Sequence, residues 1–310
     1  MSLTKISSHL RGQWLLNQAL KDHTWLAVGG PCTLFYPADQ EDLRFFLKNY
    51  QGSYHILGAG SNILVQDEGL PGVVMKLSKT FRHITVLPGN RLEAEVGVPD
   101  RFLAQFCQQE GLSGLEFLYT IPGNIGGALA MNAGCYGSEI SDVLEAAQVM
   151  DPEGNVHTLN TRELHYTYRQ CGLPKNWIFL KAIFKLRPQD PVEILNTMQS
   201  FALKRKETQP LQVKTGGSTF RNLENQGAWK LIDAVGGRGL TRGQAKFSEK
   251  HCNFLINMGQ AKAQDLWELG QEVRRRVWIH KNILLTWEIL RWGIFQDTLE
   301  CIETSCNNFH

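Results

Sequence analysis

Two glycine-rich segments of the chain could hold a phosphate group. The first covers residues 58–62, where two glycines let main-chain N–H groups approach an anion, and where Ser61 and Asn62 add side-chain donors. The apolar run at residues 63–65 follows directly and predicts a strand. A Rossmann fingerprint needs a third glycine and a helix at that point, so this loop is not one. Taken alone, the segment is more simply explained as a tight turn.

The second segment covers residues 122–127 and leads into a run of small residues that ends at Gly134. Its glycines would let the start of a helix lie close to a flat or anionic group, where free N–H groups favour a phosphate. Close packing of the helix explains the same glycines. Two such segments in one domain favour an extended ligand such as a dinucleotide. The predicted cofactor-binding residues are Gly58, Ala59, Gly60, Ser61, Asn62, Pro122, Gly123, Gly126, Gly127 and Asn132.

The composition excludes several other kinds of site. The seven cysteines form no CxxC pair and the nine histidines form no HExxH motif, so we expect neither a disulfide framework nor a metal. The net charge of +2 shows no basic excess for coating nucleic acid, and the basic run at residues 274–276 is typical of a solvated helix face. No apolar stretch is long enough to span a membrane, and residues 1–12 lack the apolar segment of a signal peptide. We therefore expect a cytoplasmic protein.

The elements that must position these segments follow a mixed α+β pattern. The linker at residues 187–191, with two prolines, separates a nucleotide-binding region from a second α+β domain, and no pattern is assigned to the tail at 294–310. Residues 209–220 are expected to form a loop. Helices are expected at 13–20, 40–50, 100–109, 191–207, 228–235 and 261–278, and strands at 25–30, 33–36, 54–57, 63–66, 73–77, 83–87, 147–150, 157–159, 177–186 and 253–257.

The sequence resembles the UDP-N-acetylenolpyruvoylglucosamine reductase (MurB) family, flavoenzymes of peptidoglycan synthesis. The similar segments occur in the family's order and cover roughly residues 20–293. They are His23-Thr24-Trp25, Gly29-Gly30-Pro31, residues 57–62, 114–117, 121–123 and 131–137, Tyr168-Arg169, and residues 217–222, 248–254 and 287–289.

The resemblance implies a fold and a division into domains. The fold is a two-part FAD-binding region of the vanillyl-alcohol-oxidase (PCMH) type, followed by an α+β substrate-binding domain. The expected parts are an N-terminal helix (1–20), an FAD-binding domain (21–188, with subdomains at 21–86 and 87–188), a substrate-binding domain (191–293) and the tail. Leu223 and Asn282 depart from the family pattern, and the short interval between Ser218 and Trp229 is similar to the family's shorter class, which lacks a tyrosine-bearing substrate loop.

The resemblance also implies a reaction and its residues. NADPH would reduce non-covalent FAD, and the flavin would deliver hydride to the enolpyruvyl group of a UDP-sugar, giving UDP-N-acetylmuramate. Arg169 would bind the substrate carboxylate with two parallel hydrogen bonds, Glu288 would act with it, and Ser218 would donate a proton. Substrate contacts are expected at Tyr136, Asn222, His251 and Asn253.

Each of these residues also has an ordinary explanation: a surface arginine, a glycine–serine turn, an exposed strand glutamate or a buried histidine. Two other functions stay open at this point. One is a flavin oxidase of the same superfamily with covalently attached FAD, although no histidine lies in either glycine segment and Cys135 is the only nearby thiol. The other is a nucleotide-binding protein without catalysis, which would need none of Arg169, Ser218 and Glu288. We expect a monomer.

Overall fold

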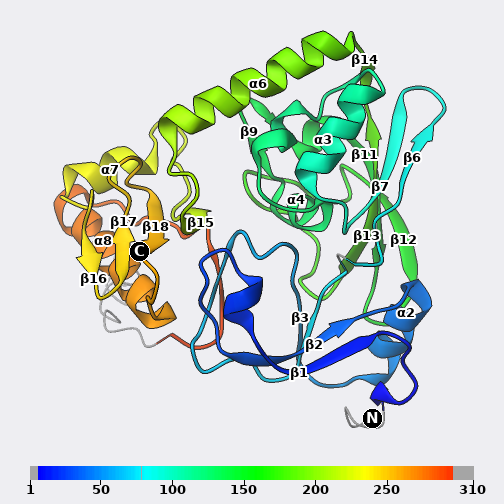
Figure 1. The fold of residues 1–310 in the computed structure, drawn as a ribbon, viewed down its shortest axis with the longest axis horizontal. Coiled ribbons are helices and arrows are strands. Elements are labelled where there is room, and N and C mark those ends of the chain that lie inside the picture. Colours follow the sequence, from blue (N-terminus) through cyan, green and yellow to red (C-terminus); the bar gives the residue numbers. More distant parts are fainter. Residues whose placement is uncertain (1–5, 78, 296–310) are drawn as a thin grey trace, which may run out of the picture. The chain divides into compact units, whose positions relative to one another are not determined.

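The computed structural model describes residues 6–77 and 79–295, which form two compact units (Figure 1). The first unit comprises the described parts of Met1–Asn17, Thr33–Ala59 and Pro71–Glu207. The second comprises those of Gln18–Cys32, Gly60–Leu70 and Thr208–His310. The predicted tail therefore lies outside the described residues except for its first two positions.

The first unit contains two main sheets over one apolar core. A four-stranded sheet has the order β1-β2-β5-β3, formed by β1 (Gln13–Ala19), β2 (Pro31–Tyr36), β5 (Val73–Met75) and β3 (Tyr54–Ile56). An antiparallel five-stranded sheet has the order β12-β11-β13-β7-β6, formed by β12 (Val156–Asn160), β11 (Leu144–Met150), β13 (Ile178–Lys185), β7 (Arg91–Glu95) and β6 (Ile84–Leu87).

The helices of this unit place their apolar faces in that core. In α2 (Gln40–Asn49) the buried side chains include Leu43, Phe46 and Leu47, and the Asp39 side chain caps the helix by accepting from the Asp42 N–H. The other helices are α3 (Asp100–Gln109), η2 (Glu116–Thr120), α4 (Ile125–Met131), α5 (Ile140–Val143) and α6 (Pro191–Thr208), and the two-residue pairs are β8 (Leu112–Ser113) with β14 (Arg187–Pro188) and β9 (Gly134–Cys135) with β10 (Ser138–Glu139).

The second unit is built around an antiparallel sheet of order β15-β18-β17-β16 and the long helix α8. The Trp267 and Trp287 rings stack in its core with centroids 5.2 Å apart, and Gly270 gives the space that the Trp287 ring occupies. Its elements are η1 (Leu20–His23), β15 (Lys214–Ser218), α7 (Ala228–Ala234), β16 (Thr241–Arg242), β17 (Ala245–Phe247), β18 (Phe254–Asn257) and α8 (Ala263–Lys281), with β4 (Ile63–Val65) parallel to β19 (Leu290–Trp292).

The prediction of a helix at residues 13–20 is wrong. The segment is strand β1, because pairing with β2 and stacking of the Trp14 ring on Phe35, 4.2 Å away at 18°, outweigh the helix propensity of its leucines. The loop expected at 209–220 contains strand β15, because its residues pair with β18. The strand expected at 25–30 is irregular chain.

The division into units also differs from the predicted one. Helix α6 belongs to the first unit although it follows the linker, because Ile194 and Met198 are buried in that unit's core. Residues 18–32 and 60–70 belong to the second unit. The other predicted helices and strands are present with ends shifted by a few residues. Among the described residues no helix is long and apolar enough to cross a bilayer.

Candidate active site

The two glycine-rich segments meet inside the first unit. The Ala59 N–H donates to Asn124 Oδ1 at 3.1 Å, and Asn124 is buried between Gly123 and α4. A Cβ atom on Gly58 would lie 2.7 Å from the same oxygen and 4.0 Å from the Gly127 nitrogen. Glycine at position 58 therefore lets the Asn124 carboxamide lie directly against the main chain of the first segment, so that main chain of both segments comes together.

Asn124 is a residue that the sequence reasoning did not single out. Its signal was available, because asparagine directly before a helix is a preferred capping residue. In this structure the side chain does not cap α4. Its oxygen instead joins the two segments, which are 65 residues apart. We add it to the residues that could hold the cofactor.

The rest of the first segment lies in the second unit. Gly60 has a φ of +72°, a left-handed conformation that favours glycine, and its carbonyl accepts from the Trp25 N–H at 2.9 Å. Asn62 Nδ2 donates to the Glu288 main-chain oxygen at 3.2 Å, and the Asn62 main-chain oxygen accepts from the Leu290 N–H at 3.1 Å. A predicted cofactor residue and a predicted catalytic residue are thus joined directly.

Arg169 lies in a tight turn of the first unit. Thr167 and Gln170 exchange main-chain hydrogen bonds of 3.0 and 3.1 Å around it, and the backbone of Arg169 is left-handed with a φ of +57°. Its guanidinium donates to the Gly134 oxygen at 2.6 Å and to the Asn132 oxygen at 3.4 Å. Both acceptors are main-chain carbonyl oxygens, and they fix the direction of the guanidinium. The prediction of a loop arginine is confirmed, since no helix or strand includes it.

Tyr136 lies at the tip of the β9–β10 hairpin with a φ of +58°. Its ring stacks on Phe201 of α6, with centroids 4.6 Å apart and an interplanar angle of 19°, and Lys204 Nζ lies 5.5 Å from the ring centroid. Burial raises the pKa of its hydroxyl. Non-glycine residues with left-handed backbone cost free energy, and such strain is common at functional sites.

Ser218 and Glu288 lie on neighbouring chain segments of the second unit. Ser218 pairs with Phe254 after an irregularity in β15, and Gly217 before it has a φ of +79° with open space where a Cβ would point. The Glu288 N–H donates to the Thr219 oxygen at 2.8 Å, one residue after Ser218. This main-chain hydrogen bond places the chain at Glu288 next to the residue that follows Ser218.

The predicted substrate contacts Asn222, His251 and Asn253 also lie in the second unit. Asn253 is buried, and its carboxamide both accepts from the Phe220 N–H at 3.0 Å and donates to the Phe220 oxygen at 2.8 Å. These two bonds brace the chain two residues after Ser218. Asn222 is exposed, and its Oδ1 accepts from the first N–H of α7 at 3.0 Å.

His251 differs from the other two. Its Nδ1 is buried and has no hydrogen-bond partner among the described residues. Burial lowers the pKa of its imidazole. A buried nitrogen without a partner is costly, so it marks a place where a ligand could bind.

Asn132 is completely buried, with all the polar atoms of its side chain engaged inside the protein. Unlike the glycines, this predicted cofactor residue contacts the turn that carries Arg169.

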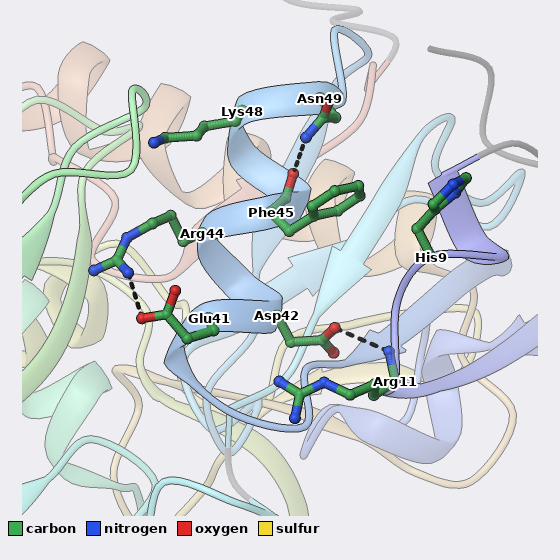
Figure 2. A pocket seen from close by; sticks show the side chains of 8 residues that line it. All are labelled: His9, Arg11, Glu41, Asp42, Arg44, Phe45, Lys48 and Asn49. Carbon is green, nitrogen blue, oxygen red and sulfur yellow. Dashed lines mark hydrogen bonds and ion pairs between the residues drawn. The ribbon is translucent and has the colours of Figure 1, made fainter.

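A separate pocket of about 340 Å³ lies beside α2 of the first unit, and none of the predicted site residues lines it (Figure 2). Three of its charged side chains have partners within the protein. Asp42 accepts from the main-chain N–H groups of Arg11 and Gly12, and Arg44 forms an ion pair with Glu41. We assign it no role in the reaction.

Comparison with known proteins identifies the family. Residues 31–160 match the model of an FAD binding domain, and residues 209–292 match that of the UDP-N-acetylenolpyruvoylglucosamine reductase C-terminal domain. A reductase of that name from Paramagnetospirillum magneticum is 47% identical over 93% of this chain and 94% of its own. The chain belongs to the UDP-N-acetylenolpyruvoylglucosamine reductase family.

Other members of the reductase family agree with this assignment. The Maricaulis maris reductase is 45% identical over 92% of this chain and 93% of its own. The crystal structure of the reductase (MurB) from Thermus caldophilus superposes with a TM-score of 0.80 at 37% identity, covering 92% of this chain and all of that one. The predicted fold class, an α+β protein with an FAD-binding region followed by a reductase C-terminal domain, is confirmed.

Proposed function

We propose that this protein reduces the enolpyruvyl group of UDP-N-acetylglucosamine enolpyruvate with NADPH, giving UDP-N-acetylmuramate for peptidoglycan synthesis. The observation that carries the proposal is the family membership over nearly the whole chain, together with the presence of Arg169, Ser218 and Glu288. A protein that merely binds nucleotides would need none of these three side chains.

FAD fits the residues of the first unit, because the contact of Gly58 and Ala59 with Asn124 brings main chain of the two glycine-rich segments together, and glycine main chain can approach a phosphate closely. When bound, FAD supplies the hydride chemistry, accepting hydride from NADPH and passing it to the substrate alkene. Cys135 is part-buried, and burial raises the pKa of its thiol, so it is a poor nucleophile for covalent attachment. We therefore propose that FAD is held non-covalently.

Arg169 is proposed to bind and orient the substrate carboxylate. Hydride addition to an alkene that bears a carboxylate moves negative charge onto that carboxylate. A fixed guanidinium stabilises the developing charge best when it needs no reorganisation. The turn at Thr167–Gln170 and the two carbonyl contacts hold Arg169 in this way.

Ser218 is proposed to donate a proton to the carbon next to the carboxylate, and Glu288 to act with Arg169 on the carboxylate. A serine hydroxyl is a weak acid in water, so proton donation requires a partner and the exclusion of water. The open space beside Gly217 leaves room for a ligand next to Ser218. Asn62 fixes the main chain of Glu288 through its side-chain hydrogen bond.

Several finer points belong to the same proposal. Tyr136, Asn222 and His251 contact the UDP-sugar, and Asn253 supports the substrate site by bracing Phe220. The chain represents the shorter class of the family, without a tyrosine-bearing loop over the substrate. We further propose that it works as a monomer in the cytoplasm.

Steady-state kinetics test the proposal. Purified, flavin-loaded protein should oxidise NADPH beyond the first equivalent, which reduces the flavin, only when the enolpyruvyl UDP-sugar is present, and the product should have the mass of UDP-N-acetylmuramate. Acid precipitation should release all the yellow colour into solution. Oxidation of NADPH without formation of that product would contradict the proposed substrate, and flavin retained on the precipitate would contradict non-covalent binding.

A further inference from the structure

Asn132 is a completely buried asparagine at the end of helix α4. It is the C-terminal cap of that helix and has a left-handed backbone with a φ of +42°, which asparagine tolerates better than most residues. The sequence places it 37 residues before Arg169, yet the two residues are in direct contact.

The Asn132 carboxamide is fully used by the protein. Its Nδ2 donates to the Glu139 carboxylate at 2.8 Å and to the Thr167 main-chain oxygen at 3.2 Å, and its Oδ1 accepts from the Ser141 N–H at 3.0 Å. A carboxamide has two N–H donors, and both are engaged. The side chain therefore has no donor left for a flavin, which argues against the direct cofactor contact predicted from the sequence.

These contacts and one main-chain contact connect Asn132 to the Arg169 turn at two points. The side chain holds the Thr167 oxygen, where the turn begins, and the Asn132 main-chain oxygen accepts from the Arg169 guanidinium at the tip of its side chain. Arg169 itself has a strained, left-handed backbone, so the surrounding contacts must hold it in this conformation. Asn132 supplies two of them.

Glu139 orients the Asn132 side chain. It caps α5, its main-chain N–H donates to Asp142 at 2.8 Å, and its carboxylate oxygen accepts from both Asn132 Nδ2 and the Ser141 hydroxyl. Hydrogen bonds to a charged acceptor are stronger than neutral ones and fix direction better. The carboxamide is thus held with its other N–H pointing to Thr167.

From this geometry we infer that Asn132, oriented by Glu139, is a positioning residue for Arg169. This inference rests on the proposed role of Arg169 as the group that binds the substrate carboxylate. It assigns Asn132 to the oxidative half-reaction, in which the enolpyruvyl substrate reoxidises the flavin. A direct cofactor contact would instead affect flavin binding and its reduction by NADPH.

The test replaces Asn132 with glycine, which accepts the left-handed backbone but has no carboxamide. Asn132→Gly should slow reoxidation of NADPH-reduced enzyme by the enolpyruvyl UDP-sugar about 10²-fold, since small misplacements of a catalytic group have effects of that order. Flavin content and reduction by NADPH should stay within about twofold of wild type, because a loss confined to one half-reaction shows which step the residue serves. The matched control is Asn282→Gly, which removes an exposed asparagine that caps α8 with the same left-handed backbone. It should leave both half-reactions unchanged.

A double-mutant cycle separates positioning from general damage. Asn132→Gly should add less than about twofold to the defect of Arg169→Ala, because the Asn132 side chain is inferred to act only through the position of Arg169. Amide hydrogen exchange across residues 165–172 should be faster in Asn132→Gly than in wild type, even before any substrate is added. Additive rate defects, or loss of flavin with slow reduction by NADPH, would overturn the inference.

Glu139→Gln provides a second variant that keeps the shape and an acceptor oxygen, in case Asn132→Gly does not fold. It should slow reoxidation selectively by about fivefold, the difference expected between a charged and a neutral acceptor. An unchanged reoxidation rate in Glu139→Gln would overturn the inference. If wild-type enzyme is not reoxidised by the substrate at all, the proposed function fails, whereas a defect in Arg169→Ala alone would count against the positioning role only.

Discussion

The Asn62 side chain donates a hydrogen bond of 3.2 Å to the main-chain oxygen of Glu288, across 226 residues of sequence. This bond joins the end of the first glycine-rich segment to the predicted catalytic glutamate inside the second unit. Glu288 is in turn held by the carbonyl of Thr219, the neighbour of Ser218. Within this unit, one predicted cofactor residue, Asn62, is therefore joined through Glu288 to the chain beside Ser218.

Ser218→Ala tests the proton donor. The variant should lose about 10²–10⁴-fold in the rate at which substrate reoxidises the reduced enzyme, the usual contribution of a general acid. Reduction by NADPH should be nearly unchanged, because it needs no proton from Ser218. Stopped-flow measurement of each half-reaction gives the comparison, with Ser53→Ala as the control at an exposed serine. Equal slowing of both half-reactions would rule out the proton-donor role.

Arg169→Lys tests the carboxylate contact. Lysine keeps the charge but not the two parallel donors of the guanidinium, so it cannot replace arginine at such a contact. We expect a loss of about 10²–10³-fold in the substrate half-reaction. Arg11→Lys is the control, since Arg11 forms an exposed ion pair with Asp39 on the first unit. Similar rates for the two variants would show that Arg169 is an ordinary surface arginine.

The sequence predicts the local structure at Arg169 but not the residues that hold it. The motif Tyr168-Arg169 indicates a loop arginine, and the structure confirms the loop. It could not indicate that Asn132, 37 residues earlier, holds this loop, because that contact depends on how α4 and the hairpin after it pack. Local pattern is read over a few residues, whereas side-chain partners are decided by tertiary structure.

The same limit explains why the helix predicted at residues 13–20 and the loop predicted at residues 209–220 differ from the structure. Residues 13–20 have the composition of a helix, and their strand conformation depends on pairing with β2 and on the Trp14–Phe35 stack. Gly216 and Gly217 made the segment before Ser218 look like a loop, yet Lys214–Ser218 pairs with β18. Amphipathic helices such as Asp100–Gln109 were predicted to the residue, because their apolar spacing is itself the cause of their burial.

Asn253→Ala tests whether this asparagine is a brace. Removing the carboxamide leaves the buried N–H and oxygen of Phe220 without partners, so the free energy of unfolding should fall by about 2–4 kcal/mol. Urea unfolding measures the change. The exposed Asn225→Ala should stay within about 0.5 kcal/mol of wild type. A fully stable Asn253→Ala with weakened substrate binding would instead support the direct contact predicted from the sequence.

Asp151 gives the protein a predictable response to acid. Burial acts to raise the pKa of this carboxyl, but hydrogen bonds from His157 and Asn155 outweigh it and lower the pKa to about 2. The unfolded carboxyl, with a pKa near about 4, takes up its proton first as the pH falls. The stabilisation, about 2 kcal/mol, is therefore complete above about pH 4 and is lost as the pH falls towards 2.

The Asp151 prediction is checked by NMR titration of its carboxyl and by comparing unfolding with Asp151→Asn. The folded protein should show a midpoint close to 2, and the stability difference between wild type and variant should shrink between about pH 4 and pH 2. A midpoint near 4, or a difference that does not depend on pH, would contradict this assignment.

The most direct test of the proposed function is a single turnover without oxygen. Flavin-loaded protein reduced with one equivalent of NADPH is mixed with UDP-N-acetylglucosamine enolpyruvate, and the flavin spectrum and the product are followed together. We predict that the oxidised flavin spectrum returns while about one equivalent of UDP-N-acetylmuramate is formed per flavin. Reduced flavin that persists in the presence of this substrate, or that reoxidises without forming the product, would contradict the proposed function.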